Sequence, residues 1–368
     1  MSSAHRYLID TASHLAGDAA FLRRWRVLLE QSAGPERIFQ SPEFFDYMIA
    51  AGDEGAGLYS ITERDSGVIV GIVPVRLRRH SLDFAVGRRR YASVPLRCVM
   101  LLGSVPLLPA DPALLDQLLQ FLLAHYPRCQ AVASPAMPAD SALWRSVSGS
   151  ALLARRYLWH LPQGWSACHR IALPADFAAY LAQFGAKRRY NLARQVRLLR
   201  EHGRDRLELH CIEHPAQLGR LADALARLTT PPRRRQLLSD ATLLEFARRG
   251  LLLCHVLECG GQPCALMLGL RHADTLYLHN LFHDAALDHL SAGTVLLHLA
   301  IEHLCRHHFR RIEFGYGAPA HHHSSSNVTE LRAQLLVLPP TLKNRLICRL
   351  HRGLICVLAW AKRRARAD

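Results

Sequence analysis

The chain has 368 residues, of which 50% are hydrophobic and 21% are charged, so extended disorder is excluded because a disordered chain is poor in apolar residues. Its apolar runs are far shorter than the roughly 20 residues of a membrane-spanning helix, no charged-then-apolar leader follows Met1, and ten cysteines form no Cys-x-x-Cys pair, which together indicate a cytoplasmic protein. The formal net charge is +16, and residues 187–206 and 341–368 carry +13 of it, which indicates two local anion-binding patches or solvated basic surfaces.

A first block of elements, from about residue 20 to residue 161, follows an α+β pattern. Ser41 as N-cap with Pro42 at the first helical position predicts a helix start. The turn signal at residues 65–67 lies between two apolar runs and predicts a β-hairpin. The sequence predicts these helices and strands in the block: helices at 25–31, 42–48 and 114–125, and strands at 58–62, 68–75, 98–102 and 131–134.

A second block, from about residue 169 to residue 314, repeats the order of hairpin, strand, long helix and strand. The sequence predicts these elements: helices at 176–184, 187–202, 218–228, 241–250 and 293–309, and strands at 170–173, 207–211, 252–258, 264–271, 275–282 and 311–314. The Pro-Pro-Arg-Arg-Arg run at 231–235 predicts a loop. The shared order indicates a degenerate tandem repeat of one α/β fold.

The best candidate for a binding site is the loop at 283–294, between a predicted strand and a predicted helix. Ser291 and Gly293 would place free backbone N–H groups and the positive end of the helix dipole at one point, which suits a phosphate or pyrophosphate. An ordinary helix cap is the alternative, because Ser-x-Gly before a helix is common.

The basic helix at 187–202 has two different faces. An apolar stripe of Leu192, Val196 and Leu199 is predicted to pack inward, and Arg194 and Arg197 are predicted on the opposite face. Glu201 alone can balance these arginines, so anion binding and a solvated face remain equally open.

Two further groups of residues could carry chemistry. Glu313 ends a predicted strand before a Gly-containing loop, where a carboxylate could accept a proton from an amine, or could instead pair with Arg310 or Arg311. The histidines at 321–323 cannot easily ligate one ion, because neighbouring residues of a strand point to opposite faces, and no metal site is predicted. The cysteines at 254, 259 and 264 are interpreted as buried thiols.

The C-terminal segment, residues 342–368, is predicted to form a basic amphipathic helix. Its apolar stripe comprises Leu346, Leu350, Leu354, Val357 and Trp360. Such a stripe is most often core-facing, so docking on the protein is favoured over contact with an anionic membrane surface.

Three segments resemble the CelD-like and FemAB-like branch of the GNAT acyltransferase superfamily. They are the Phe-Gln-Ser-Pro-Glu run at 39–43, the segment 173–203 with its Arg189-Tyr-Asn191 core, and the segment 260–317. The last contains Gly-x-Pro-x-Ala, Asp284, Ser-x-Gly-Thr at 291–294 and a Glu313-Phe-Gly-Tyr-Gly strand end.

The resemblance implies tandem GNAT-like folds, with mixed central sheets flanked by helices and a degenerate N-terminal copy. The expected domains are 20–165, 166–335 and a basic helical tail at 336–368. No cofactor would be bound permanently, and acyl-CoA would be the co-substrate, with its pyrophosphate at Ser291, Ala292, Gly293 and Thr294.

The resemblance also implies an N-acyltransferase that moves an acyl group from acyl-CoA to a primary amine of a sugar or small metabolite, in polysaccharide or natural-product biosynthesis. The candidate catalytic residues are Glu313, His279 and Asp284. The candidate substrate or anion ligands are Arg189, Asn191, Arg194, Arg197 and Tyr316. Two alternatives remain: a FemAB-like peptidyl transferase that uses aminoacyl-tRNA, and a non-catalytic basic binding module.

Overall fold

The structure is a computed structural model that describes residues 6–32, 34–87, 89–316 and 325–364. The chain divides into two compact units: residues 1–167 with 330–368 form the first unit, and residues 168–329 form the second. The chain enters the second unit along β7 (Ser166–Ala172) and leaves it along β13 (Val328–Leu338). The tail beyond residue 335, expected to be separate, is grouped with the first unit in this division.

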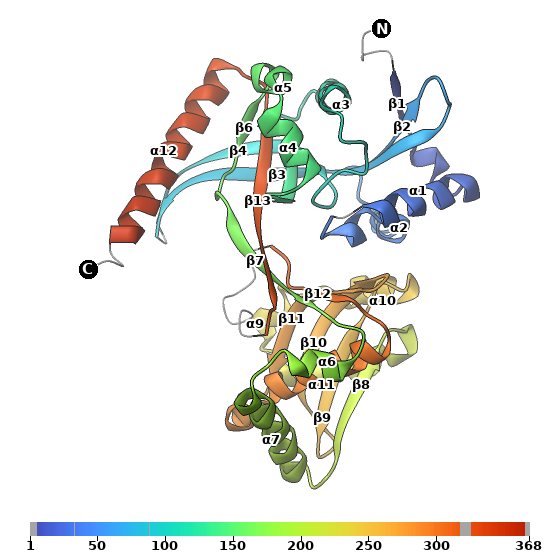
Figure 1. The fold of residues 1–368 in the computed structure, drawn as a ribbon, viewed down its shortest axis with the longest axis vertical. Coiled ribbons are helices and arrows are strands. Elements are labelled where there is room, and N and C mark those ends of the chain that lie inside the picture. Colours follow the sequence, from blue (N-terminus) through green and yellow to red (C-terminus); the bar gives the residue numbers. More distant parts are fainter. Residues whose placement is uncertain (1–5, 33, 88, 317–324, 365–368) are drawn as a thin grey trace. The chain divides into compact units, whose positions relative to one another are not determined.

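The first unit is built on a mixed sheet with strand order β1-β2-β3-β4-β5-β13, and β6 pairs with β13 (Figure 1). Its strands, besides β13, are β1 (Tyr7–Thr11), β2 (Ala56–Glu63), β3 (Ile69–Val86), β4 (Arg89–Leu101), β5 (Ala131–Pro138) and β6 (Leu158–His160). Its helices of more than one turn are α1 (Ala19–Gln31), α2 (Pro42–Ala50), α3 (Pro112–His125), α4 (Ala142–Gly149), α5 (Ala151–Arg156) and α12 (Leu342–Arg364).

Local sequence explains how these elements begin and pair. The Ser41 hydroxyl accepts a hydrogen bond from the Phe44 N–H at 3.2 Å, which confirms the predicted cap of α2. The hairpin of β2 and β3 is also confirmed. β3 is longer than predicted, because it pairs with β4 all the way from Val75↔Leu101 to Val86↔Arg89.

The second unit is built on a sheet with strand order β7-β12-β11-β10-β9-β8. Its strands, besides β7, are β8 (Leu207–Ile212), β9 (Cys254–Cys259), β10 (Gln262–His272), β11 (Thr275–His283) and β12 (Arg311–Glu313). Its α-helices are α6 (Phe177–Ala182), α7 (Ala186–His202), α8 (Leu218–Leu228), α9 (Pro231–Arg234), α10 (Asp240–Arg248) and α11 (Ala292–Arg306). The loop predicted at 231–235 is wrong, because Pro231 starts the one-turn helix α9.

Helices cover both faces of the second sheet. Leu253, just before β9, and Leu257 of β9 pack in one apolar core with residues of α11 and α7, among them Leu296 and Leu199. Glu258 points the other way, because side chains alternate along a strand, and it meets Arg220 of α8 at 3.2 Å. The two faces of this sheet therefore carry different chemistry.

The helix α12 packs on the first unit through a face that the sequence did not predict. Cys348 and His351 are buried, and His351 stacks edge-on against Phe84 of β3, with ring centroids 5.1 Å apart. Leu346 and Leu350 of the predicted inward stripe are exposed instead. Docking through the leucine stripe is therefore wrong, because the small thiol and the imidazole allow a close approach to β3 and β6. None of the described helices is long and apolar enough to cross a membrane.

Candidate active site

The parallel strands β11 and β12 separate after three residue pairs. Their register runs from Thr275↔Arg311 to Tyr277↔Glu313, where β12 ends, while β11 continues to His283. Beyond Tyr277, the backbone groups on this edge of β11 no longer pair with β12. The second sheet thus opens between two central strands, and an extended ligand could pair there with backbone N–H and C=O groups.

A β-bulge lies at this opening. Leu268 of β10 pairs with Asn280 and Gly269 pairs with Leu278, so His279 is the extra residue of β11. A bulge frees the backbone of the extra residue and changes which face the following side chains occupy. In a regular strand Leu278 and Leu281, which are three positions apart, would face opposite sides of the sheet. Because of the bulge, both pack against the apolar core that α11 covers. Sequence reasoning selected His279 as a candidate base but did not predict the bulge that frees its backbone.

The side chain of His279 has exposed surface, yet the surrounding protein lowers the pKa of its imidazole by desolvation. A pKa below the ordinary value near 6.5 keeps the imidazole neutral at pH 7, in the form that can accept a proton.

The N-terminus of α11 follows β11 through the short helix at Ala285–Leu290. Ser291 is the N-cap, and its backbone is left-handed with φ 55°, so its side chain makes no capping hydrogen bond. No described residue accepts a hydrogen bond from the N–H groups of Ala292 or Gly293. A Cβ on Gly293 would lie 3.0 Å from the Leu281 side chain, so this turn packs closely against β11. The predicted site at 291–294 thus offers free N–H donors at a helix start.

The basic helix α7 packs beside this N-terminus. The Gln195 side-chain amide donates a hydrogen bond to the Ser291 hydroxyl at 3.2 Å, and Asn191 lies one turn earlier on the same face of α7. Leu199, on the inward face of α7, is buried, as its place in the apolar stripe predicts. Sequence reasoning missed Gln195, because an uncharged residue between two arginines gives no signal of anion binding.

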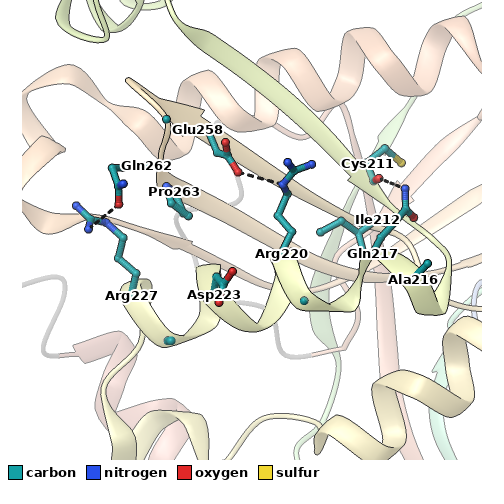
Figure 2. A pocket seen from close by; sticks show the side chains of 13 residues that line it. Cys211, Ile212, Ala216, Gln217, Arg220, Asp223, Arg227, Glu258, Gln262 and Pro263 are labelled. Carbon is teal, nitrogen blue, oxygen red and sulfur yellow. Dashed lines mark hydrogen bonds and ion pairs between the residues drawn. The ribbon is translucent and has the colours of Figure 1, made fainter.

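A cleft lies on the other face of the second sheet, between α8 and the strands β8 to β10 (Figure 2). Its volume is about 1110 Å³. Arg220 pairs with Glu258 across it, and Arg227 donates a hydrogen bond to Gln262 at 3.2 Å. The Asp223 carboxylate lies on α8 between these two arginines (Figure 2). The cleft therefore combines carboxylates and guanidinium groups, which suits a polar or zwitterionic molecule.

Residues 186–323 match the family model described as an acetyltransferase (GNAT) domain. This part of the chain is a GNAT-type acyltransferase domain. Both the match and the opened sheet with an uncapped helix start lie in the second unit, which we call the GNAT domain. No curated protein sequence matches the chain significantly.

Solved structures share the fold at low sequence identity. FemX aligns with a TM-score of 0.58 and 9% identity, covering 86% of this chain and 95% of FemX. A conserved protein of unknown function from Bacteroides thetaiotaomicron aligns with a TM-score of 0.52 and 13% identity, covering 86% and 97%. The C-terminal domain (DUF2156) of a putative lysylphosphatidylglycerol synthetase from Agrobacterium fabrum aligns with a TM-score of 0.50 and 12% identity, covering 92% and 97%. These likenesses confirm a FemAB-like form of the GNAT fold.

The other predicted catalytic residues of the GNAT domain have structural partners. Glu313 is only 2% exposed and lies 3.8 Å from Arg170, its cross-strand partner on β7. The ion pair predicted with Arg310 or Arg311 is thus with Arg170 instead, because Arg170 lies directly opposite Glu313 in the pairing of β7 with β12. Asp284 caps the short helix after β11 and lies 3.8 Å from Arg227.

The remaining predicted ligands of the GNAT domain are spread over two elements. Arg189 donates a hydrogen bond to the Phe184 carbonyl at 2.7 Å, and Arg197 lies 3.6 Å from Glu201. Arg194 and Arg197 are both exposed, whereas Gln195 is half-buried. They are one and two residues from Gln195 along α7, so they lie on other faces of the helix. Tyr316 is half-buried after Gly315, whose φ is +77°. Gly317 and the histidines at 321–323 lie outside the described residues.

Proposed function

We propose that the GNAT domain transfers an acyl group from acyl-CoA to a primary amine of a sugar or small metabolite in the cytoplasm, in polysaccharide or natural-product biosynthesis. One observation carries this proposal: the strands β11 and β12 separate at Tyr277, and the same strand β11 leads into the uncapped start of α11. The opening suits the extended pantetheine arm, and the N–H groups of Ala292 and Gly293 suit the pyrophosphate.

The residues at the opening support aminolysis of a thioester. The amine nitrogen attacks the thioester carbonyl, the new C–N bond forms, and the C–S bond breaks to release CoA as a thiolate, which then takes up the proton that the amine loses. Neutral His279 accepts the proton that the amine nitrogen loses, and free backbone N–H groups beside the bulge stabilise the charge on the carbonyl oxygen. Glu313 is better placed to position β12 than to take a proton, because its side chain is buried and lies 3.8 Å from the Arg170 guanidinium on β7.

The cleft of Figure 2 is the proposed site for the acceptor. Asp223 and Glu258 would attract an ammonium group, and Arg220 and Arg227 would attract a carboxylate or hydroxyl groups on the same molecule. The ion pair of Arg227 with Asp284 connects this cleft to the end of β11.

Thermal unfolding with CoA and a thiol-release assay with acetyl-CoA test the function directly. CoA at 100 times its dissociation constant should stabilise the protein by about 2.7 kcal/mol. Amino sugars and amino acids should then be acylated, as followed by the mass of the product. A protein that neither binds CoA nor releases thiol from acyl-CoA with any amine would overturn the proposal.

Aminoacyl-tRNA is a second candidate donor, because α7 presents an exposed basic face. Arg194 and Arg197 point away from the stripe that packs on the core. The Arg194→Ala/Arg197→Ala double variant should keep its CoA response if the donor is acyl-CoA. A salt-dependent gel shift with tRNA that this variant loses, without any response to CoA, would favour aminoacyl-tRNA instead.

We also propose that α12 attaches the protein to an anionic membrane surface. Its outward face exposes five large apolar side chains by between 56% and 87%: Leu342, Leu346, Leu350, Val357 and Trp360. Arg345, Arg349 and Arg352 are exposed beside this stripe, and α12 has seven Lys and Arg residues but no Asp or Glu. A second copy of α12 would bring like charges together, whereas acidic lipid headgroups would neutralise them.

Sedimentation with vesicles tests this attachment. The protein should sediment with vesicles that contain phosphatidylglycerol at low salt, and much less with phosphatidylcholine alone or at high salt. Leu346→Glu/Leu350→Glu should abolish sedimentation. Ile49→Glu, on α2, makes the same kind of change at another exposed aliphatic residue and should have no effect. Equal sedimentation of the α12 variant and the wild type would exclude this role.

A further inference from the structure

Three side chains with metal-binding atoms converge on the face of the GNAT sheet that α11 covers. Cys211 of β8 and His255 of β9 are direct cross-strand partners, and His303 comes from α11. The thiol sulfur and one ring nitrogen of each histidine all lie within 4.8 Å of one another. The His255 Nε2 and His303 Nδ1 atoms are 3.1 Å apart. Ligands around one tetrahedral zinc ion lie about 3.3–3.8 Å apart, given zinc–nitrogen and zinc–sulfur distances near 2.0 and 2.3 Å.

The nearest fourth candidate ligand, Glu213, lies directly after the end of β8. Glu213 follows Cys211 by two residues, and its Oε1 atom is 3.6 Å from the Cys211 sulfur. Arg271 lies 3.2 Å from the same oxygen, and holds the carboxylate beside the cluster. Cys211, Glu213 and His303 all line a cavity of about 300 Å³, which gives an ion a path from solvent. His255 itself is fully buried.

The first unit contains a matched pair of histidines that serves as an internal comparison. His160 Nε2 and His351 Nδ1 are also 3.1 Å apart and buried. The other nitrogen of His351 lies 3.3 Å from the Asp83 carbonyl oxygen. Among the described residues, no Cys, Asp or Glu places a ligand atom close enough to join this pair in a metal site. A hydrogen bond between two rings explains the pair in the first unit, but it does not explain the thiol and carboxylate beside the pair in the second.

We propose that Cys211, His255 and His303 bind a zinc ion, with Glu213 as the nearest fourth ligand. A set of one thiolate and two imidazoles favours Zn²⁺ over Mg²⁺ or Ca²⁺, which prefer oxygen ligands. The ion would join the edge strand β8 to α11, whose N-terminus is the proposed donor site. The site is independent of the proposed acyl transfer, since it lies near the C-terminal end of α11.

A second acidic cluster does not support a comparable site. Glu208, His210 and Glu258 lie close together on the opposite face of the sheet. Arg220 contacts two of the three groups of this cluster, His210 and Glu258, at 2.9 and 3.2 Å, whereas Arg271 pairs with Glu213, the fourth ligand of the proposed site. We therefore assign metal binding only to the cluster beneath α11.

Metal content and cobalt spectroscopy test the proposal on the full-length protein. The protein purified without chelator should contain about one zinc per chain, and after stripping it should bind Co²⁺ with a thiolate-to-cobalt charge-transfer band. Cys211→Ala should abolish the band and weaken zinc binding by more than about 100-fold, because even partners of ligands contribute about 10–100-fold. Glu213→Gln should weaken binding less.

Two matched variants separate a ligand effect from a general loss of structure. Cys254→Ala removes a buried thiol one residue from His255 on β9, outside the cluster, and should leave the cobalt band unchanged. His351→Ala breaks the histidine pair of the first unit and should also leave it unchanged, whereas His303→Ala should abolish it. Wild-type zinc affinity in folded Cys211→Ala and His303→Ala proteins, or no charge-transfer band in the wild type, would overturn the proposal.

Discussion

The two units each join a pair of parallel strands through one long helix, but the start of that helix differs. In the first unit, β4 and β5 pair in parallel at Cys98↔Ala131 and α3 connects them. The Asp111 carboxylate accepts a hydrogen bond from the Ala113 N–H at 2.9 Å, and Pro112 lacks an N–H. In the second unit, Ser291 leaves the corresponding N–H groups without a side-chain acceptor. A phosphate could bind only at the second helix, because a carboxylate already occupies the first.

The ends of the parallel strands differ in the same way. In the first unit, Ser134 of β5 donates a hydrogen bond to the Ser104 carbonyl, and Gln40 packs against Gly103, so the chain itself fills the region after β4. In the second unit, β11 carries the bulge at His279 where the strands separate. Chain segments thus occupy the space after β4 in the first unit, whereas β11 and β12 separate in the second unit, where the donor is proposed to bind.

The largest effect is expected at His279, which has no counterpart at the closed end of β4. His279→Ala should lower kcat by about 10²–10⁴-fold, the usual contribution of a general base. Because desolvation lowers the pKa of His279, the wild-type rate should be full at pH 7 and fall only as the pH drops below 6.5 through that lowered pKa. A pH–rate profile of wild type and variant measures both. An unchanged kcat in His279→Ala would assign proton transfer to another group.

Acid should destabilise the first unit through its own histidine pair. Burial lowers the pKa of His160 to about 4, whereas an unfolded histidine titrates near 6.5. Between these values the unfolded chain binds more protons, so stability is lost as the pH falls from 6.5 through 4, by on the order of 3 kcal/mol. Urea unfolding at several pH values in this range, with EDTA present, should show a weaker pH dependence in His160→Gln. Equal slopes would mean that His160 is not neutral in the fold.

Copying the first unit's carboxylate into the second tests the main difference between them. Ser291→Asp places a negative charge where the pyrophosphate is proposed, and should remove the CoA-induced stabilisation of about 2.7 kcal/mol. Ser291→Asn is the neutral control, because Asn and Asp both tolerate a left-handed backbone. Thermal unfolding with and without CoA compares the two. A CoA response that survives in Ser291→Asp would place the donor elsewhere.

Sequence patterns predicted most elements but few of the contacts that assemble the sites. The Ser41 cap and the stripe at Leu199 are local, so periodicity and composition were enough to find them. The partners Gln195 and Ser291, or Cys211 and His303, are 96 and 92 residues apart, and only packing of α7 and β8 against α11 brings them together. The face on which α12 docks was also beyond sequence, because the burial of Cys348 and His351 depends on the shape of β3 and β6.

The smallest expected effect concerns the stability of the two helix starts. Asp111→Ala removes a real cap and should cost about 1 kcal/mol of unfolding free energy. Ser291→Gly should cost less than about 0.5 kcal/mol, because Ser291 makes no capping hydrogen bond and glycine adopts a φ of 55° without strain. Denaturant unfolding of both variants without CoA measures the difference. If Ser291→Gly destabilises the protein as much as Asp111→Ala does, Ser291 is a structural cap, and the second helix start is no freer to bind a phosphate than the first.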